Sequence, residues 1–254
     1  MSKIEITPLG TVSPYPKENM NCPGFLIKYN NKNVLLDCGN GITRLLKLPK
    51  DLENLNVIIT HYHKDHFGDI GALQYASYVY HNLGVLNNKI KIYLPENDIN
   101  FSKQMIISSP ESFVEYFDIN DNFSFSMDDL NVSFKDNNSH SIESFMVKLQ
   151  NDDFKIVYTS DVGITNFNSL IDFCKDADLL ICESSFLKKH NSNSKVHLTA
   201  YDASILAKES NSKNLLLTHF WPEEDKSSYL NEAIQNFENV EVSYEGKKIV
   251  LERR

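Results

Sequence analysis

Thr60-His61-Tyr62-His63-Lys64-Asp65-His66 places four residues of metal-ligating type within six positions. The apolar run before this segment predicts a buried strand, and Phe67-Gly68-Asp69 after it opens a helical pattern. In an extended segment His61 and His63 point to the same side, so both imidazoles can reach one cation. Asp65 and His66, at the turn into the helix, can reach a second cation nearby. Imidazole with carboxylate and without thiolate suits zinc or a neighbouring divalent transition metal.

Composition limits the class of protein. The chain has 254 residues, of which 41% are hydrophobic, so it can bury a sizeable core. No apolar run approaches the ~20 residues that a membrane span needs, and the N-terminal residues alternate like a strand, without the apolar centre of a signal peptide. We therefore expect a cytoplasmic protein without a membrane segment. Its cysteines are expected to be four free thiols: Cys22, Cys38, Cys174 and Cys182.

Charge bears on the partners. The formal net charge is -9, and the sequence contains no run of basic residues of the kind that grips nucleic acid phosphates. Nucleic acid is therefore not an expected partner, and the composition favours a small-molecule substrate.

Strand and helix patterns alternate in both halves of the chain, without a low-complexity linker, which predicts an α/β fold. Helical patterns cover residues 42–48, 68–83, 97–108, 170–175, 201–209 and 226–237. Thr199 is the expected N-cap of the helix at 201–209. Residues 239–244 and 247–252 predict two strands of a closing hairpin.

Candidate site residues share a placement at or just beyond the C-terminal end of an apolar strand: Asp37, His61, Asp161, Glu183 and His219. Open sheets bind ligands at such edges. His140, in a loop before the strand at 144–149, is a weak candidate on its own. His81 is expected in the last turn of the helix at 68–83, and His190 is expected to be solvated in a polar loop.

Taken in order, these motifs resemble the five motifs of the metallo-β-lactamase-fold hydrolases: Asp37, His61 to His66, His140, Asp161 and His219. The resemblance spans nearly the whole chain and implies a four-layer αββα sandwich, a single domain over residues 1–254, with a two-metal site at one edge. It implies one metal held by His61, His63 and His140. It implies a second metal held by Asp65, His66 and His219, with the Asp161 carboxylate as the bridge. Asp37 would support the ligand loop.

The resemblance also implies a chemistry. Two Zn2+ ions, with Mn2+ as the alternative, would share a water, lower its pKa and present hydroxide as the nucleophile. Asp65 can both bind a metal and orient that hydroxide. Asp161, where thiolate-using β-lactamases carry cysteine, and His63, where flavodiiron relatives carry a carboxylate, favour zinc-dependent hydrolysis.

Three segments are similar to the ribonuclease Z branch of these hydrolases: Glu183-Ser184-Ser185-Phe186, His197-Leu198-Thr199 and Leu217-Thr218-His219-Phe220. In that branch an extra histidine, paired with a carboxylate, assists departure of the leaving oxygen. The similarity therefore implies His197 as a general acid and Glu183 as the residue that orients it, and the alternative for His197 is a helix-capping role. Ribonuclease Z proteins usually carry a long tRNA-binding arm between the motifs at His140 and Asp161, which here lie only 21 positions apart.

The sequence thus predicts a ribonuclease Z-like hydrolase without the arm, acting as a dinuclear zinc phosphodiesterase on a small phosphodiester. Three alternatives stay open. They are a carboxylic-ester or lactone hydrolase, an RNA-processing nuclease of ribonuclease Z type, and a metal-binding module without catalysis. The resemblance is compatible with a homodimer but names no interface.

Overall fold

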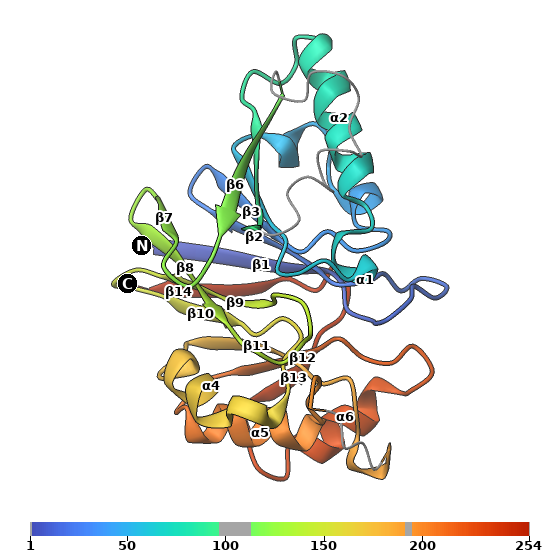
Figure 1. Ribbon diagram of the computed structural model, residues 1–254, viewed down its shortest axis with the longest axis vertical. Coiled ribbons are helices and arrows are strands. Elements are labelled where there is room, and N and C mark those ends of the chain that lie inside the picture. The colour runs from blue at the N-terminus through green and yellow to red at the C-terminus, as the bar shows by residue number, and fades with distance from the viewer. Residues whose placement is uncertain (1, 97–112, 191–194, 254) are drawn as a thin grey trace. The chain divides into compact units, whose positions relative to one another are not determined.

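The computed structural model describes residues 2–96, 113–190 and 195–253, which form two compact units (Figure 1). The first unit comprises Met1–Gly10, Tyr15–Ile119 and Tyr244–Arg254, and the second comprises Thr11–Pro14 and Asn120–Ser243. Each unit contains one mixed seven-stranded sheet, so the α/β class expected from the sequence is confirmed. The assignment of residues 1–254 to a single domain stays a prediction.

The sheet of the first unit has the strand order β14-β1-β2-β3-β4-β5-β6. The strands are β1 (Ser2–Gly10), β2 (Gly24–Tyr29), β3 (Lys32–Leu36), β4 (Leu55–Ile58), β5 (Ile90–Pro95), β6 (Val114–Ile119) and β14 (Ile249–Arg253). The pairs from β14 to β3 are antiparallel, and those from β3 to β6 are parallel. β2 and β3 form an antiparallel hairpin, and Asn30 adopts the positive φ of its turn.

Among the described residues, four helical segments accompany this sheet: η1 (Thr43–Leu45), η2 (Lys50–Leu52), α1 (Lys64–Phe67) and α2 (Ile70–Asn82). Ile70 and Leu73 of α2 are buried in one cluster with Val57 of β4. The helix predicted over residues 42–48 is wrong in extent, because only the short 3₁₀ turn η1 forms. Leu48 precedes Pro49, and a residue before proline disfavours the helical backbone. The helix predicted over residues 97–108 lies outside the described residues.

The sheet of the second unit has the order β13-β12-β11-β10-β9-β8-β7. Its strands are β7 (Ser124–Met127), β8 (Leu130–Asp136), β9 (Phe145–Gln150), β10 (Lys155–Tyr158), β11 (Leu179–Glu183), β12 (Leu215–Thr218) and β13 (Val240–Val242). The pairs from β7 to β10 are antiparallel and those from β10 to β13 are parallel. Both units thus combine an antiparallel half with a parallel half.

Three helices of the second unit, α4 (Phe167–Cys174), α5 (Ala200–Glu209) and α6 (Lys226–Ala233), pack along the parallel half of its sheet (Figure 1). The short 3₁₀ segments η5 (Ile164–Asn166) and η6 (Lys188–His190) lie in the connections. The predicted N-cap is confirmed, because Thr199 and Asp202 form a reciprocal capping box at the start of α5. Because Thr199 follows His197 by two residues, this cap fixes the backbone just after His197.

The predicted closing hairpin is wrong. β13 pairs in parallel with β12, whereas β14 pairs antiparallel with β1 in the sheet of the first unit. The residues between the two strands have the composition of a turn, but they do not determine which strand each one pairs with. β13 and β14 each add to the edge of a different sheet. The four cysteines are free, as expected, and all four are buried. Within the described ranges no helix is both long and apolar enough to cross a membrane.

Candidate functional site

The segment after β4 carries the candidate ligands of the first unit. His61 is fully buried, and its Nε2 lies 3.1 Å from Nδ1 of His63. The two ring centroids are 4.6 Å apart, as expected for residues two positions apart in an extended segment. Thr60 Oγ1 lies 3.1 Å from Nδ1 of His61, which leaves Nε2 as the nitrogen turned toward His63. One cation could therefore contact both rings.

Asp37, the residue after β3, holds this segment through a buried carboxylate. Oδ2 accepts from Nδ1–H of His66 at 2.8 Å, and Oδ1 accepts from the N–H and the hydroxyl of Thr60 at 2.9 Å each. Because His66 donates through Nδ1, its Nε2 carries a lone pair in the neutral ring. That nitrogen lies 3.6 Å from Oδ2 of Asp65. Two electron-pair donors thus lie close together, as ligands of one cation do.

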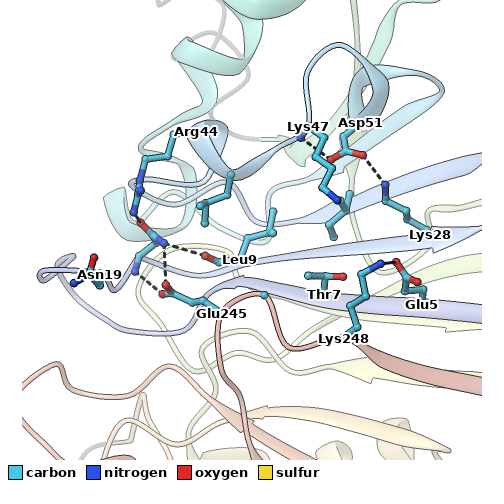
Figure 2. A pocket seen from close by; sticks show the side chains of 14 residues that line it. Glu5, Thr7, Leu9, Asn19, Lys28, Arg44, Lys47, Asp51, Glu245 and Lys248 are labelled. Atoms are coloured by element: carbon cyan, nitrogen blue, oxygen red, sulfur yellow. Dashed lines mark hydrogen bonds and ion pairs between the residues drawn. The ribbon is translucent and has the colours of Figure 1, made fainter.

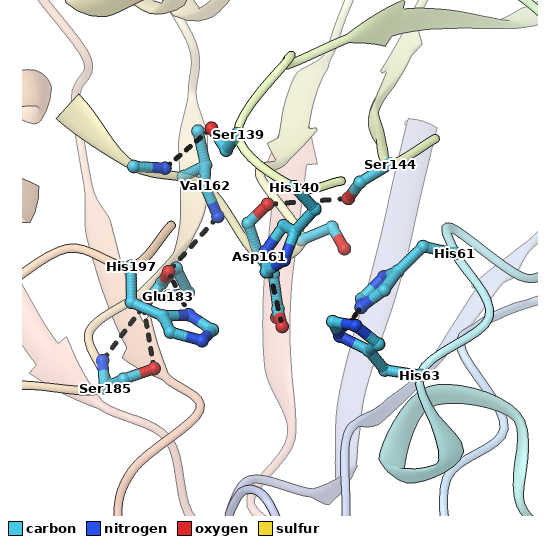
Figure 3. Close-up of polar contacts among 12 residues, drawn as sticks. His61, His63, Ser139, His140, Ser144, Asp161, Val162, Glu183, Ser185 and His197 are labelled. Carbon is cyan, nitrogen blue, oxygen red and sulfur yellow. Dashed lines mark hydrogen bonds and ion pairs between the residues drawn. The ribbon is translucent and has the colours of Figure 1, made fainter. Parts of the chain in front are cut away.

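In the second unit the candidate ligands follow β10 and β12. Oδ1 of Asp161 lies 2.9 Å from Nε2 of His219, and Oδ2 lies 4.0 Å from Nε2 of His140, which stands beside Asp161 in Figure 3. Ser160 and His219 both have positive φ, +54° and +65°. Non-glycine residues in this conformation cost free energy and cluster at functional sites. The backbone therefore supports a site at these strand ends.

The loop that contains His140 is tied to the end of β10. The side-chain amide of Asn137 donates to the carbonyl of Asp161 at 2.8 Å, and the N–H of Gly163 donates to Oγ of Ser139 at 2.8 Å. These two bonds bring His140 beside Asp161 although the two residues lie in different connections of the sheet. The residue types alone do not show that Asn137 and Ser139 position the loop that contains His140.

Ser185 connects a carboxylate to a candidate ligand, a role that the sequence does not reveal. Its hydroxyl donates to Oε2 of Glu183 at 3.0 Å, since a carboxylate oxygen only accepts. Oγ must then accept from Nδ1–H of His219, at 2.8 Å. In the neutral ring Nε2 of His219 then carries a lone pair, and it lies 2.9 Å from Oδ1 of Asp161. Two acceptors this close need a cation or a proton between them.

His197 is paired with Glu183 as the sequence suggests. Its Nδ1–H donates to Oε1 of Glu183 at 2.9 Å (Figure 3). The His197 ring centroid lies 5.4 Å from that of His140 and 5.5 Å from that of His219. Burial lowers the pKa of His197, but the Glu183 carboxylate outweighs burial, and with Asp161 it raises that pKa above its ordinary value. The imidazolium form of His197, which can release a proton, is therefore favoured beside the candidate ligands.

Two other histidines do not join these clusters. His81 is in the last turn of α2, as predicted. The prediction that His190 is solvated is wrong, because its ring stacks on Trp221 at 4.9 Å and its Nε2 lies 2.8 Å from Oε1 of Glu224. Contacts with Trp221 and Glu224, in a distant segment, partly bury a loop histidine that the local sequence shows only as polar.

The donor atoms fit a divalent metal. Three histidines contact an oxygen atom through Nδ1: His61, His66 and His219. Nε2 of each ring is then the nitrogen that can bind a metal. Metal-binding histidines in proteins are commonly held by a hydrogen bond at the other ring nitrogen in this way. In the second unit, potential ligand atoms of His140, Asp161 and His197 all lie within 4.8 Å of one another. Imidazole and carboxylate without thiolate suit zinc or a similar ion.

A separate cavity of about 410 Å3 lies in the first unit, and none of the predicted ligands lines it (Figure 2). Its carboxylates already have partners. Glu5 accepts from Lys248 at 2.7 Å, and Asp51 accepts from Lys28 at 2.5 Å. Glu245 accepts from Asn21. Paired charges of this kind offer little for catalysis, so we do not place the reaction there.

Buried imidazole and carboxylate donors at the ends of strands, in mixed sheets flanked by helices, define the class as a metallo-hydrolase of α/β architecture. The chain belongs to the β-lactamase superfamily, since the family model described as "Beta-lactamase superfamily domain" matches residues 32–220.

Individual relatives resemble the chain over most of their length. The probable metallo-hydrolase YhfI of Bacillus subtilis (strain 168) is 29% identical over 217 residues, 85% of this chain and 86% of that protein. Its crystal structure gives a TM-score of 0.88 at 26% identity and covers 98% of this chain and 99% of that chain. Ribonuclease Z of Clostridioides difficile (strain 630) is 27% identical over 291 residues, 93% of this chain and 94% of that protein. The short form of human tRNase Z shares the fold, with a TM-score of 0.74 at 22% identity over 96% of this chain and 98% of that chain.

These similarities confirm the metallo-β-lactamase fold and the relation to ribonuclease Z that the motifs indicate. They also support a hydrolase that depends on divalent metal.

Proposed function

We propose that this protein is a dinuclear zinc phosphodiesterase that cleaves a small phosphodiester. The observation that carries the proposal is the pair of His197 and Glu183, with the His197 ring 5.4 Å and 5.5 Å from the rings of two candidate ligands, His140 and His219. Metal ligands alone would serve ester, lactone or phosphodiester hydrolysis. A proton donor beside them suits a reaction whose leaving oxygen needs protonation.

The proposed ligands are the seven residues that the sequence indicates: His61, His63, Asp65, His66, His140, Asp161 and His219. When bound, Zn2+ or Mn2+ supplies an activated water and polarises the attacked phosphoryl oxygen. Asp65 keeps a carboxylate oxygen that can orient the attacking water. Asp37 and Ser185 hold His66 and His219 by Nδ1, so that Nε2 of each ring would be the nitrogen that binds a cation.

Two residues of the second unit perform the proton transfer in this proposal. Glu183 accepts from Nδ1–H of His197 and thereby leaves Nε2 as the position from which a proton can pass to the leaving oxygen. The carboxylate also favours the charged imidazole, which must be present before the transfer. After transfer, the neutral ring keeps its Nδ1–H bond to Glu183 and is ready to be protonated again.

A phosphodiester substrate is further supported by sequence similarity to ribonuclease Z. Ribonuclease Z, which is named for its action on RNA, is 27% identical across nearly the whole chain. This similarity makes an RNA-processing nuclease the second candidate. Two observations favour a small substrate instead: the formal net charge of -9, and residues 140–161, which consist of the antiparallel pair β9 and β10 with short connections.

The test uses metal-stripped protein reloaded with Zn2+ or Mn2+, with metal content counted by mass spectrometry. Hydrolysis of bis(p-nitrophenyl) phosphate is compared with that of p-nitrophenyl acetate, a lactone and a short RNA. Metal-dependent cleavage of the phosphodiester, with two ions bound for each chain, is the expected result. Cleavage of only the acetate or the lactone would replace this function with the carboxylic-ester alternative. Cleavage of RNA alone would favour the nuclease, and no turnover with two bound metals would favour a binding module.

A further inference from the structure

Trp221 is the single tryptophan of the chain, and it lies two residues after the candidate ligand His219. The backbone that places His219 at the end of β12 therefore also places Trp221. Phe220, between them, is fully buried, whereas Trp221 keeps 37% of its surface exposed. The largest apolar side chain of the protein thus lies partly in solvent, beside the candidate site of the second unit.

The indole is held in one position from several sides. His190 stacks on it with centroids 4.9 Å apart and planes 27° apart, and Phe186 meets it edge-on at 5.1 Å. His190 is itself fixed, since its Nε2 lies 2.8 Å from Oε1 of Glu224. The backbone N–H of Trp221 donates to the hydroxyl of the buried Tyr229 at 3.2 Å. An aromatic surface fixed in this way loses little conformational entropy when a ligand binds.

Phe186 links this indole to the proposed proton donor. The centroid of its ring lies 5.8 Å from that of His197 and 5.1 Å from that of Trp221. Its backbone is also fixed, because its N–H donates to the carbonyl of Leu198 at 3.1 Å and its carbonyl accepts from Ala200 at 2.9 Å. The distance between Trp221 and His197 is therefore set by one well-held residue rather than by a free loop.

We propose that Trp221 is the stacking platform for the nucleobase of a nucleotide phosphodiester, an inference that rests on the proposed phosphodiesterase function. One exposed aromatic residue needs no explanation by itself. Trp221, however, is rigidly held, lies two residues after a candidate ligand and is separated from the proton donor by a single ring. A planar base can lie on the part of the indole that His190 leaves open, since every base has a π-face. The indole N–H adds a donor that has no acceptor among the described residues.

The single tryptophan allows a direct test, because all indole fluorescence of the protein comes from this ring. We would titrate the holoprotein with adenosine 5′-monophosphate and, in parallel, with ribose 5-phosphate, which carries the same phosphate and sugar without a base. Saturable quenching by the nucleotide and none by the sugar phosphate is the expected result. Equal responses to both, or no response to the nucleotide, would overturn the proposal.

Kinetics on two esters give a second readout. Trp221→Leu is expected to raise KM for a dinucleotide about tenfold, the equivalent of about 1.4 kcal/mol, with little change in kcat. KM for glycerophosphoethanolamine, a phosphodiester without a ring, should change less than about twofold, since no stacking contact is lost. Trp221→Phe should keep most of the affinity. Tyr75→Leu, which shortens an exposed aromatic residue of α2, is the matched control and should change neither KM.

The two proposals can fail separately. If the wild-type protein cleaves neither ester, the phosphodiesterase function is wrong, and the fluorescence titration still decides whether Trp221 binds a base. If both esters are cleaved but Trp221→Leu raises both KM values equally, the platform is wrong while the phosphodiesterase function stands. Circular dichroism of each variant excludes a general loss of folding as the cause.

Discussion

His197 Nδ1 lies 2.9 Å from Oε1 of Glu183, and this one carboxylate connects the proposed proton donor to a proposed metal ligand. Oε1 also accepts from the N–H groups of Val162 and Leu198, and Oε2 accepts from the N–H and hydroxyl of Ser185. Ser185 in turn accepts from His219. Five donors are thus directed at the Glu183 carboxylate, which holds His197 directly and His219 through Ser185.

Replacing His197 should reveal a dependence on the leaving group. His197→Ala is expected to lower kcat/KM for a dinucleotide by roughly 10²–10⁴, the range typical of general acid catalysis. The leaving group of a dinucleotide is a sugar oxygen, which would depart as an alkoxide if no proton were supplied. Bis(p-nitrophenyl) phosphate should be affected far less, because nitrophenolate departs without a proton. Metal content, measured by mass spectrometry, should not change. The control is His81→Ala in the last turn of α2. An equal loss on both esters, or a loss of metal, would contradict the proposed role.

Substitutions of Glu183 should separate its charge from its structural role. Glu183→Gln keeps the shape of the side chain but places an amide N–H₂ group where its neighbours also donate. We therefore expect kcat for the dinucleotide to fall about tenfold or more. Glu183→Ala leaves three buried backbone N–H groups without acceptors, those of Val162, Leu198 and Ser185. At about 1 kcal/mol or more each, the free energy of unfolding should fall by about 3 kcal/mol. Urea unfolding measures the second effect; unchanged stability in the alanine variant would mean that these contacts carry little energy.

Asp37 should act on metal affinity rather than on the fold. Asparagine tolerates the positive φ of this position, +58°, so Asp37→Asn preserves the backbone. It removes the charge that fixes Nδ1 of His66, and the affinity for zinc should fall about 10–100-fold, as for other outer contacts of ligands. Competition with a chromophoric chelator measures this. Asp51→Asn, at another buried aspartate of the first unit, is the control: it loses its bond to Lys28 but should keep zinc affinity.

The elements that carry the site were predictable because their signals are local. Buried apolar runs mark β4, β10, β11 and β12, and a polar residue just after such a run lies at the sheet edge. That reasoning places His61, Asp161, Glu183 and His219 without any structure. The pairing of His197 with Glu183 needed the resemblance to a known family, since fourteen positions separate the two residues and no periodicity relates them.

Contacts between residues that are distant in the chain could not be predicted from the sequence, because they depend on the tertiary structure. The hydroxyl of Ser185 joins Glu183 to His219, which lies 34 positions away, and a serine after a strand has no distinctive signal. The strands β13 and β14 read as a hairpin because the turn between them is polar, yet each pairs in a different sheet. His190 reads as solvated until Glu224, also 34 positions away, is placed beside it.

Gly163 gives a test of the His197 position that does not alter any polar group of the site. A Cβ on Gly163 would lie 1.6 Å from the carbonyl oxygen of Lys195 and 2.7 Å from the nitrogen of Val196. Its φ of -111° suits alanine, so the effect of Gly163→Ala is steric and falls on the segment leading into His197. We expect this variant to repeat the leaving-group dependence of His197→Ala in weaker form, and to lose about 1–3 kcal/mol of unfolding free energy, as in other overpacked sites.

Thr165→Ala is the matched control for Gly163→Ala. The Thr165 hydroxyl donates to the same carbonyl of Lys195 at 3.4 Å from an exposed position, so its removal adds no volume to the segment. Stability should change by no more than about 0.5 kcal/mol, and the ratio of the two ester rates should stay at the wild-type value. If Gly163→Ala slows both esters equally, the displaced segment disturbs more than proton transfer. If it leaves both rates unchanged, the His197 side chain does not need the position in which Glu183 holds it, and the proton donor must be sought elsewhere.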